Sequence, residues 1–341
     1  MLRILFASLL FAQAAYAYED LDAYNEKEIV VHTKRIDLPD FPGSFNPSII
    51  RFDADSYLLI FRFSPDPHED YCISYLGAAL LDKNFDFLTE PRLLNTRSRG
   101  SVNPSHAEDP RIFSYRGRFF LLYNDNIEQP MLALSDRRDM FMAELIRRNE
   151  NFVLSSPLKL VCDEKLYRQR WEKNWIPFEW NKTLLLAYSI QPHEILYPNL
   201  TSGACYTCYY SQGEIEWDWG TLRGSSAAIL VDGEYLAFFH SGRKLVSEVS
   251  WGWELWHYFM GAYTFAPEPP FQLTRISPEP ISAEGFYTKS NYAKRVIFPG
   301  GFVVEGDEIH VAYGKDDCEV WIATLNKKKL FESLVPVKTV P

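Results

Sequence analysis

The sequence predicts an all-β protein, a five-bladed β-propeller with its active site in the central channel. One observation is a strand–turn–strand unit with a polar entry, which occurs five times. Another is the aromatic content of 16%, because aromatic side chains favour strands. A third is the spacing of 62, 65, 51 and 74 residues between the aromatics that end the returning strands, at Phe61, Tyr123, Tyr188, Phe239 and Tyr313. Units at such intervals are typical of propeller blades, whose first strands line one channel.

The clearest unit runs from Asn103 to Asn124, where carboxylates and an arginine stand directly before two apolar strands joined at Gly117. Polar groups at the start of a rigid hairpin suit a site that must be held still. The five hairpins are expected near residues 46–63, 108–124, 172–189, 222–240 and 294–314. Because a divided propeller leaves blades unpaired, we expect residues 18–341 to form a single domain.

Helix is expected to be minor and to lie mostly at Asp136–Asn149. Within that range four apolar residues fall near helical spacing, namely Met140, Phe141, Leu145 and Ile146. The charged residues between them are expected to form the solvated face of this helix.

The N-terminus has the features of a signal peptide, residues 1–17, with Arg3 before the apolar run Ile4–Phe11 and a cleavage signal ending at Ala17. That run is too short to span a bilayer, so we expect an exported chain without a membrane anchor, periplasmic, secreted or in the secretory pathway.

The five cysteines of an exported chain permit two disulfides. The pair in Cys205-Tyr-Thr-Cys208 lacks the second cysteine pair that a zinc site would need. A net charge of −10 argues against nucleic acid as a partner.

In a propeller the five polar entries converge at one mouth, which allows the candidate site to be assembled from the sequence. The convergent residues are Asn46, Ser48, Arg62, Glu108, Asp109, Arg111, Glu172, Lys173, Asn174, His193, Arg223, His240, Asp316 and Asp317. They include no Ser/His/Asp elbow, phosphate loop or metal-ligand spacing, so no metal or organic cofactor is expected. Carboxylates beside amides and arginines suit glycosyl transfer, in which a carboxylic acid protonates the leaving oxygen. A sugar-binding propeller without catalysis would use the same groups, so both interpretations stand.

Several motifs resemble glycoside hydrolase family 130, and the resemblance covers about residues 40–325. They are NPS at 46–48, AEDPRIF at 107–113, EKNWIPF at 172–178, LRGSS at 222–226, FFHSG at 238–242, YTFAPEPPF at 263–271 and FPGGFVVEGDEIHVAYGKDD at 298–317. The related protozoan mannosyltransferase-phosphorylases share much of this pattern. The resemblance implies a five-bladed propeller enzyme that acts on β-mannosides, of β-1,2 or β-1,4 linkage.

The resemblance also implies roles for individual residues. Asp109 corresponds to the general acid, which in the family's phosphorylases acts through a hydroxyl of the mannose. Mannose binding is implied for Asn46, Ser48, Arg62, Asn174 and Asp317. Lys173, His193, Arg223 and His240 form a cationic set that suits inorganic phosphate, whereas Glu172 is the candidate base for activating water. Phosphorolysis, hydrolysis and β-mannosyl transfer all stay open, because the cationic set favours phosphate and export favours hydrolysis.

Overall fold

The computed structural model describes residues 21, 28–65, 73–97, 105–126, 138–165 and 171–339. Within these ranges the chain is all-β, as expected, with a 3-10 turn at Glu248–Ser250 and one α-helix, α1 (Lys327–Ser333). The expected signal peptide and Cys72 lie outside them. The four described cysteines carry free thiols. No helix in the described ranges is long and apolar enough to cross a membrane.

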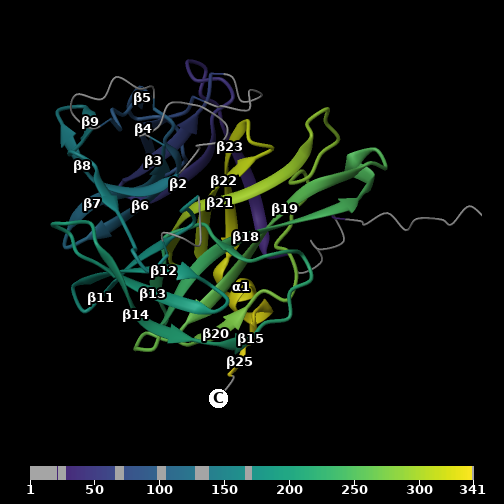
Figure 1. Ribbon diagram of the computed structural model, residues 1–341. Coiled ribbons are helices and arrows are strands. Elements are labelled where there is room, and N and C mark those ends of the chain that lie inside the picture. The colour runs from purple at the N-terminus through teal and green to yellow at the C-terminus, as the bar shows by residue number, and fades with distance from the viewer. Residues whose placement is uncertain are drawn as a thin grey trace, which may run out of the picture.

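The first half of the chain forms three antiparallel sheets (Figure 1). The first contains β2 (Phe45–Arg51), β3 (Ser56–Phe63), β4 (Tyr75–Asp82) and β5 (Arg92–Leu93). The second contains β6 (Glu108–Tyr115), β7 (Arg118–Asp125), β8 (Asp139–Arg148), β9 (Asn151–Leu154) and β10 (Leu158–Leu160). The third contains β11 (Ile176–Trp180), β12 (Thr183–Ser189), β13 (His193–Pro198) and β14 (Cys205–Ser211).

The second half forms one large sheet, to which the N-terminal strand β1 adds an edge by pairing with β23. Its strands are β1 (Val30–Ile36), β16 (Arg223–Gly224), β17 (Ile229–Val231), β18 (Glu234–Val246), β19 (Glu254–Phe265), β20 (Leu273–Ile276), β21 (Lys294–Glu305), β22 (Glu308–Lys315), β23 (Glu319–Asn326) and β24 (Val335–Pro336). A separate pair joins β15 (Gly213–Glu214) to β25 (Lys338–Thr339). The sheet is mostly antiparallel, but β19 and β21 pair in parallel.

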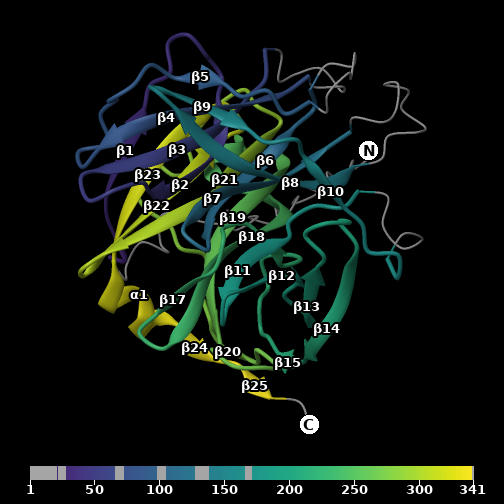
Figure 2. The same ribbon diagram turned by 90° about the vertical axis from the view of Figure 1, so that its left-hand side faces the viewer.

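Strands β2, β6, β11, β17 and β21 come from the five hairpins and lie in one region of the protein (Figure 2). A cavity of about 300 Å³ is lined by β2, β6, β11, β17 and β21, through Ile49, Ile50, Ile112, Phe113, Pro177, Phe178, Ile229, Leu230, Gly301 and Phe302 among others. Strand β2 also packs directly against β6, β21 and β22. Gly300 permits this approach, because a Cβ there would collide with the carbonyl oxygen of Pro47. The inner strands of all five hairpins are thereby gathered around one cavity.

The helix expected at Asp136–Asn149 was wrong, because this stretch contains strand β8. The strand pairs with β7 on one side and with β9 and β10 on the other. Its side chains alternate between two apolar clusters, with Met140 and Met142 in one and Phe141 and Ala143 in the other. Because both faces of β8 are buried, apolar residues follow one another without a polar alternate, and such a run also matches helical spacing.

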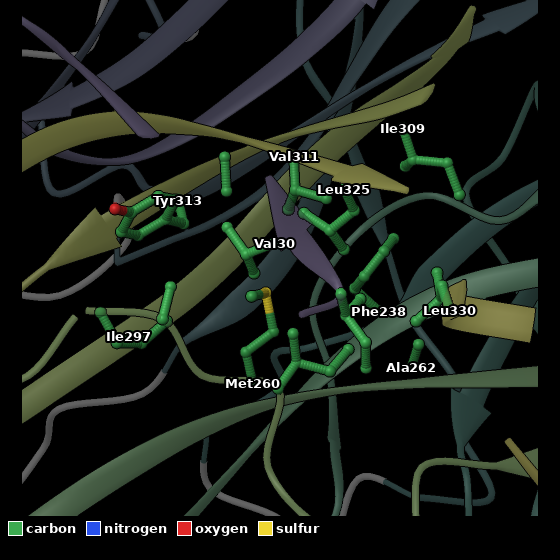
Figure 3. Packing of buried hydrophobic residues seen from close by; sticks show 14 of the residues in the cluster. Val30, Phe238, Met260, Ala262, Ile297, Ile309, Val311, Tyr313, Leu325 and Leu330 are labelled. Carbon is green, nitrogen blue, oxygen red and sulfur yellow. The ribbon is translucent and has the colours of Figure 1, made fainter. Parts of the chain in front are cut away.

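The core of the large sheet holds its last two hairpins together (Figure 3). Phe238 of β18, Met260 of β19 and Val311 of β22 are fully buried in this cluster. Leu330 of α1 is also fully buried there, which docks the helix onto the sheet. The strand ends that carry the polar residues are therefore supported by close apolar packing.

Candidate active site

Three polar residues at strand entries adopt a left-handed backbone conformation. Their φ values are 44° for Asn46, 50° for Asp109 and 68° for Asn174. Asn and Asp tolerate this region better than most residues. At Asn46 and Asp109 the β2–β3 and β6–β7 ladders also shift register. Because such a bulge bends the strand and redirects a side chain, the local sequence turns both residues out of their ladders.

Asp109 lies at the centre of the resulting cluster. Asn46 Nδ2 donates to Asp109 Oδ1 at 2.9 Å, and Arg62 Nη1 donates to the same oxygen at 3.3 Å. Arg111 donates to the backbone carbonyl of Asp109 at 2.8 Å and to Asn174 Oδ1 at 3.2 Å. Residues from three hairpins thus converge on one buried carboxylate, as the sequence predicts for the mouth.

The Asp109 carboxylate is held in its ionised form. Burial acts to raise the pKa of Asp109, but the charges of Arg62 and Arg111, the Asn46 hydrogen bond and the Lys173 charge together lower it to about 2. Asp109 is therefore a carboxylate at neutral pH in this arrangement. For Asp109 to carry a proton, negative charge must enter the site or a neighbouring cation must be neutralised.

Arg62 is positioned by a second carboxylate. Its Nη2 forms an ion pair with Glu108 Oε1 at 2.7 Å, and Arg138 Nη2 pairs with the same oxygen at 2.9 Å. The Arg62 guanidinium also lies 4.6 Å from the centroid of the Phe45 ring. Sequence reasoning missed Arg138, because it placed that residue on the solvated face of a helix.

Arg223 and His240 lie opposite each other on β16 and β18. Ser225 Oγ lies 2.6 Å from His240 Nδ1. Burial, followed by the charges of Arg223, Arg111 and Lys173, lowers the pKa of His240 to about 3, against the opposing effect of Asp109. His240 is therefore a neutral imidazole at neutral pH and not a member of the cationic set.

Lys173 and Arg223 are the positive charges on this side of the site. The Lys173 ammonium lies 5.2 Å from the centroid of the Trp171 ring, and its charge acts on both Asp109 and His240. In the part of the chain that the structure describes, neither Lys173 nor Arg223 forms an ion pair with a carboxylate. The same ranges contain no group of three or more His, Cys, Asp or Glu residues arranged to hold a metal.

Asp317 forms an ion pair with Lys294 at the entry of β21. Burial lowers the pKa of Lys294, and so does the charge of Arg62. The charge and hydrogen bond of Asp317 outweigh both, so the pKa of Lys294 is raised. The pair is thereby linked to the cluster around Asp109. Sequence reasoning treated Lys294 only as the start of a hairpin, although its place at a strand entry was the available signal.

Asp316, the residue before Asp317, accepts a hydrogen bond from the backbone of Val296 at 2.9 Å, and burial raises the pKa of Asp316 to about 6.

Ser48 and His193 lie elsewhere than their implied roles suggest. Ser48 is fully buried, and its Oγ accepts a hydrogen bond from the backbone N–H of Ile112 at 3.1 Å, which ties β2 to β6. His193 Nδ1 lies 2.7 Å from the carbonyl oxygen of Phe271, and its ring centroid is 4.9 Å from that of Phe265. These contacts place His193 in an apolar core, where burial lowers its pKa to about 4.

Glu172 is buried beside aromatic side chains of the third hairpin. Its Oε2 accepts a hydrogen bond from Trp175 Nε1 at 3.2 Å. Burial and then the Glu172 charge raise the pKa of the Tyr188 hydroxyl. The carboxylate of the candidate base is thus in contact with Trp175 and close to Tyr188.

A protein-family model described as β-1,4-mannooligosaccharide phosphorylase matches residues 23–335. The chain belongs to glycoside hydrolase family 130. Members of this family are glycoside phosphorylases and hydrolases, and the chain is accordingly an enzyme. No curated protein matches it significantly.

Solved structures resemble the family 130 chain over most of its length. One of these structures, from Parabacteroides distasonis, is described as a glycoside hydrolase. It has 15% identity, a TM-score of 0.62 and coverage of 85% of this chain and 88% of that one. A β-1,2-mannobiose phosphorylase from Listeria innocua, in complex with β-1,2-mannobiose, has 14% identity, a TM-score of 0.59 and coverage of 89% and 99%. A mannose phosphorylase from Leishmania mexicana with bound phosphate has 11% identity, a TM-score of 0.55 and coverage of 94% and 96%. At these identities the likeness shows a shared fold.

Proposed function

We propose that this family 130 enzyme is an inverting β-mannoside phosphorylase built as a five-bladed propeller. The observation that carries the choice of phosphate is the pair Lys173 and Arg223, two cations that form no ion pair among the described residues and whose charges act on the same imidazole, His240. Arg223 is exposed and Lys173 is half-buried, so both are open to an anion from solution, and charge-assisted hydrogen bonds from such cations favour phosphate binding. The propeller is supported by the cavity that inner strands of all five hairpins line.

In the proposed reaction a phosphate oxygen attacks the anomeric carbon of the terminal mannose as the bond from that carbon to the leaving oxygen breaks. Lys173 and Arg223 hold the phosphate. Asp109 supplies the proton to the leaving oxygen by way of a mannose hydroxyl, as the family resemblance implies. The products are mannose 1-phosphate and the shortened sugar.

Phosphate binding also offers a way to place a proton on Asp109. The Lys173 charge contributes to the low pKa of Asp109. A phosphate bound at Lys173 and Arg223 adds negative charge there and cancels part of that field, so the pKa of Asp109 rises when the co-substrate binds. Phosphate binding would thus shift Asp109 toward the protonated form that a general acid needs.

Substrate choice and mechanism can be tested together with β-1,2- and β-1,4-mannobiose, each incubated with and without phosphate. The proposal expects turnover only with phosphate, the release of mannose 1-phosphate, and activity that survives Glu172→Gln. Free mannose at full rate in phosphate-free buffer, lost in Glu172→Gln, would instead establish hydrolysis. Tight binding of a mannoside without turnover under either condition would support a sugar-binding protein.

A further inference from the structure

The far end of the β18–β19 hairpin projects from the body of the protein (Figure 1). Its ladder runs from the pair Tyr235–Phe265 to the pair Val246–Glu254. His240 of the candidate active site pairs with Arg223 and lies in the middle of β18, which runs from Glu234 to Val246. The part of β18 after His240, with the paired part of β19, therefore reaches outward from the mouth.

One face of this outer part carries a row of rings that begins at His240. The ring centroids of His240 and Tyr258 are 6.3 Å apart, and those of Tyr258 and Trp256 are 6.1 Å apart. The interplanar angles are 36° and 34°, so successive rings turn only moderately. Trp256 is 43% exposed, whereas the alternate residue His257 is fully buried. The strand thus presents its aromatic residues to solvent on one side.

The residues opposite these rings keep the face open. Gly242 pairs with Tyr258, and a Cβ at Gly242 would lie 2.9 Å from Tyr258 Cε1. Glycine therefore lets the tyrosine ring lie across the neighbouring strand. Lys244 pairs with Trp256, and its Nζ lies 5.9 Å from the centroid of the indole ring.

Strand β19, which carries Tyr258 and Trp256, also borders β21, where Lys294 lies near the cluster around Asp109. Trp256 pairs in parallel with Lys294, which forms the ion pair with Asp317. The phenol of Tyr258 and the guanidinium of Arg62 both act on the Lys294 charge. The Lys294–Asp317 ion pair and the partly exposed indole of Trp256 are therefore neighbours on adjoining strands.

We propose that the face formed by Tyr258, Trp256 and Lys244 is an additional subsite, which binds mannose units of a longer β-mannoside chain outside the position of cleavage. The inference rests on the proposed function and names a longer oligosaccharide as the substrate. Aromatic faces stack on the apolar faces of pyranose rings, while an ammonium group donates hydrogen bonds to sugar hydroxyls. Continuity with the active site favours the substrate's own chain over a second protein as the occupant.

The test is calorimetric binding of β-linked mannobiose and mannotetraose, without phosphate, to the full-length protein carrying Asp109→Asn, which is expected to slow turnover. The tetrasaccharide is expected to bind about 10-fold more tightly than the disaccharide. Trp256→Ala should abolish that difference with little effect on the disaccharide, and Trp256→Phe should restore part of it. Trp253→Ala is the matched control, because Trp253 is 71% exposed on the same hairpin but lies outside the row.

The possible outcomes separate this inference from the function on which it rests. Equal affinities for the two sugars, or an equal loss in Trp256→Ala and Trp253→Ala, would overturn the subsite while leaving mannobiose binding intact. Binding of neither sugar would overturn both. Thermal unfolding of Trp256→Ala should be close to that of the parent, because Trp256 is 43% exposed and belongs to none of the apolar core clusters of the described residues.

Discussion

Asn46 donates a 2.9 Å hydrogen bond to the carboxylate of Asp109 across 63 residues of sequence. Both residues have a positive φ and lie where their strands leave the regular ladder. The bond therefore joins the entries of two successive hairpins at the centre of the site. It orients the carboxylate from outside its own hairpin, which explains how irregular local backbone can hold the proposed acid in place.

Asp109→Asn should lower turnover by about 10²–10⁴-fold while mannoside binding persists. The amide retains the size of the carboxyl group and can still accept hydrogen bonds from Asn46 and Arg62, but it has no acidic proton to transfer. Steady-state kinetics and calorimetric binding measure the two effects. Asp307→Asn, in the exposed turn after β21, is the control and should behave like the parent. Near-normal turnover in Asp109→Asn would remove this residue from the role of acid.

Glu108→Gln should reduce kcat/KM for mannosides by about 10-fold or more, because Arg62 and Arg138 lose the charge that anchors them. The expected change is mainly in KM, since Glu108 positions Arg62 and does not itself transfer a proton. Glu305→Gln is the matched control, as it breaks a more exposed ion pair with Arg51. Equal kinetics for Glu108→Gln and the parent would mean that Phe45 and Asp109 suffice to hold Arg62.

Arg223→Ala should raise the phosphate concentration needed for half-maximal activity by about 10-fold or more. Any slow hydrolysis in phosphate-free buffer should be nearly unchanged, because the substitution removes an anion ligand and leaves Asp109 in place. Initial rates over a range of phosphate concentrations measure the effect. Arg148→Ala, on the exposed end of β8, provides an arginine control. Unchanged phosphate dependence in Arg223→Ala would place the anion elsewhere.

Asp125→Asn should increase stability at pH 8 and have little effect at pH 4. Burial raises the pKa of Asp125 to about 7, against the hydrogen bonds from the backbone of Asn126 and His106. The neutral carboxyl is therefore favoured in the folded state, and this contribution is complete below the unfolded pKa and lost as pH rises through 7. The gain is at most about 4 kcal/mol by the pKa difference. Urea unfolding at both pH values measures it, and an equal change at pH 4 and pH 8 would contradict the explanation.

Much of the secondary structure was readable from local pattern. Strands such as β3 and β7 combine aromatic and branched apolar residues between turn residues, which is a local property. The error at β8 had a tertiary cause, since only the sheets on either side make both of its faces buried. His193 was misplaced for a similar reason. Its position after a strand suggested the mouth, but its ring packs against Phe265. Phe265 pairs with Tyr235, which lies five residues before His240 on β18, or roughly 16 Å away at the usual rise of a strand.

The sequence by itself determined the all-β class, the motifs that indicate family 130, and the identity of Asp109 as the central carboxylate. Those features depend on residue type and short spacing, which a chain carries before it folds. Only the tertiary structure decided which polar side chains meet. It joined Arg138 to Glu108, paired Lys294 with Asp317, removed the charge of His240 by burial, and withdrew Ser48 into the packing between strands. These outcomes depend on distances between hairpins and on the local dielectric, and neither quantity is a property of any single stretch of sequence.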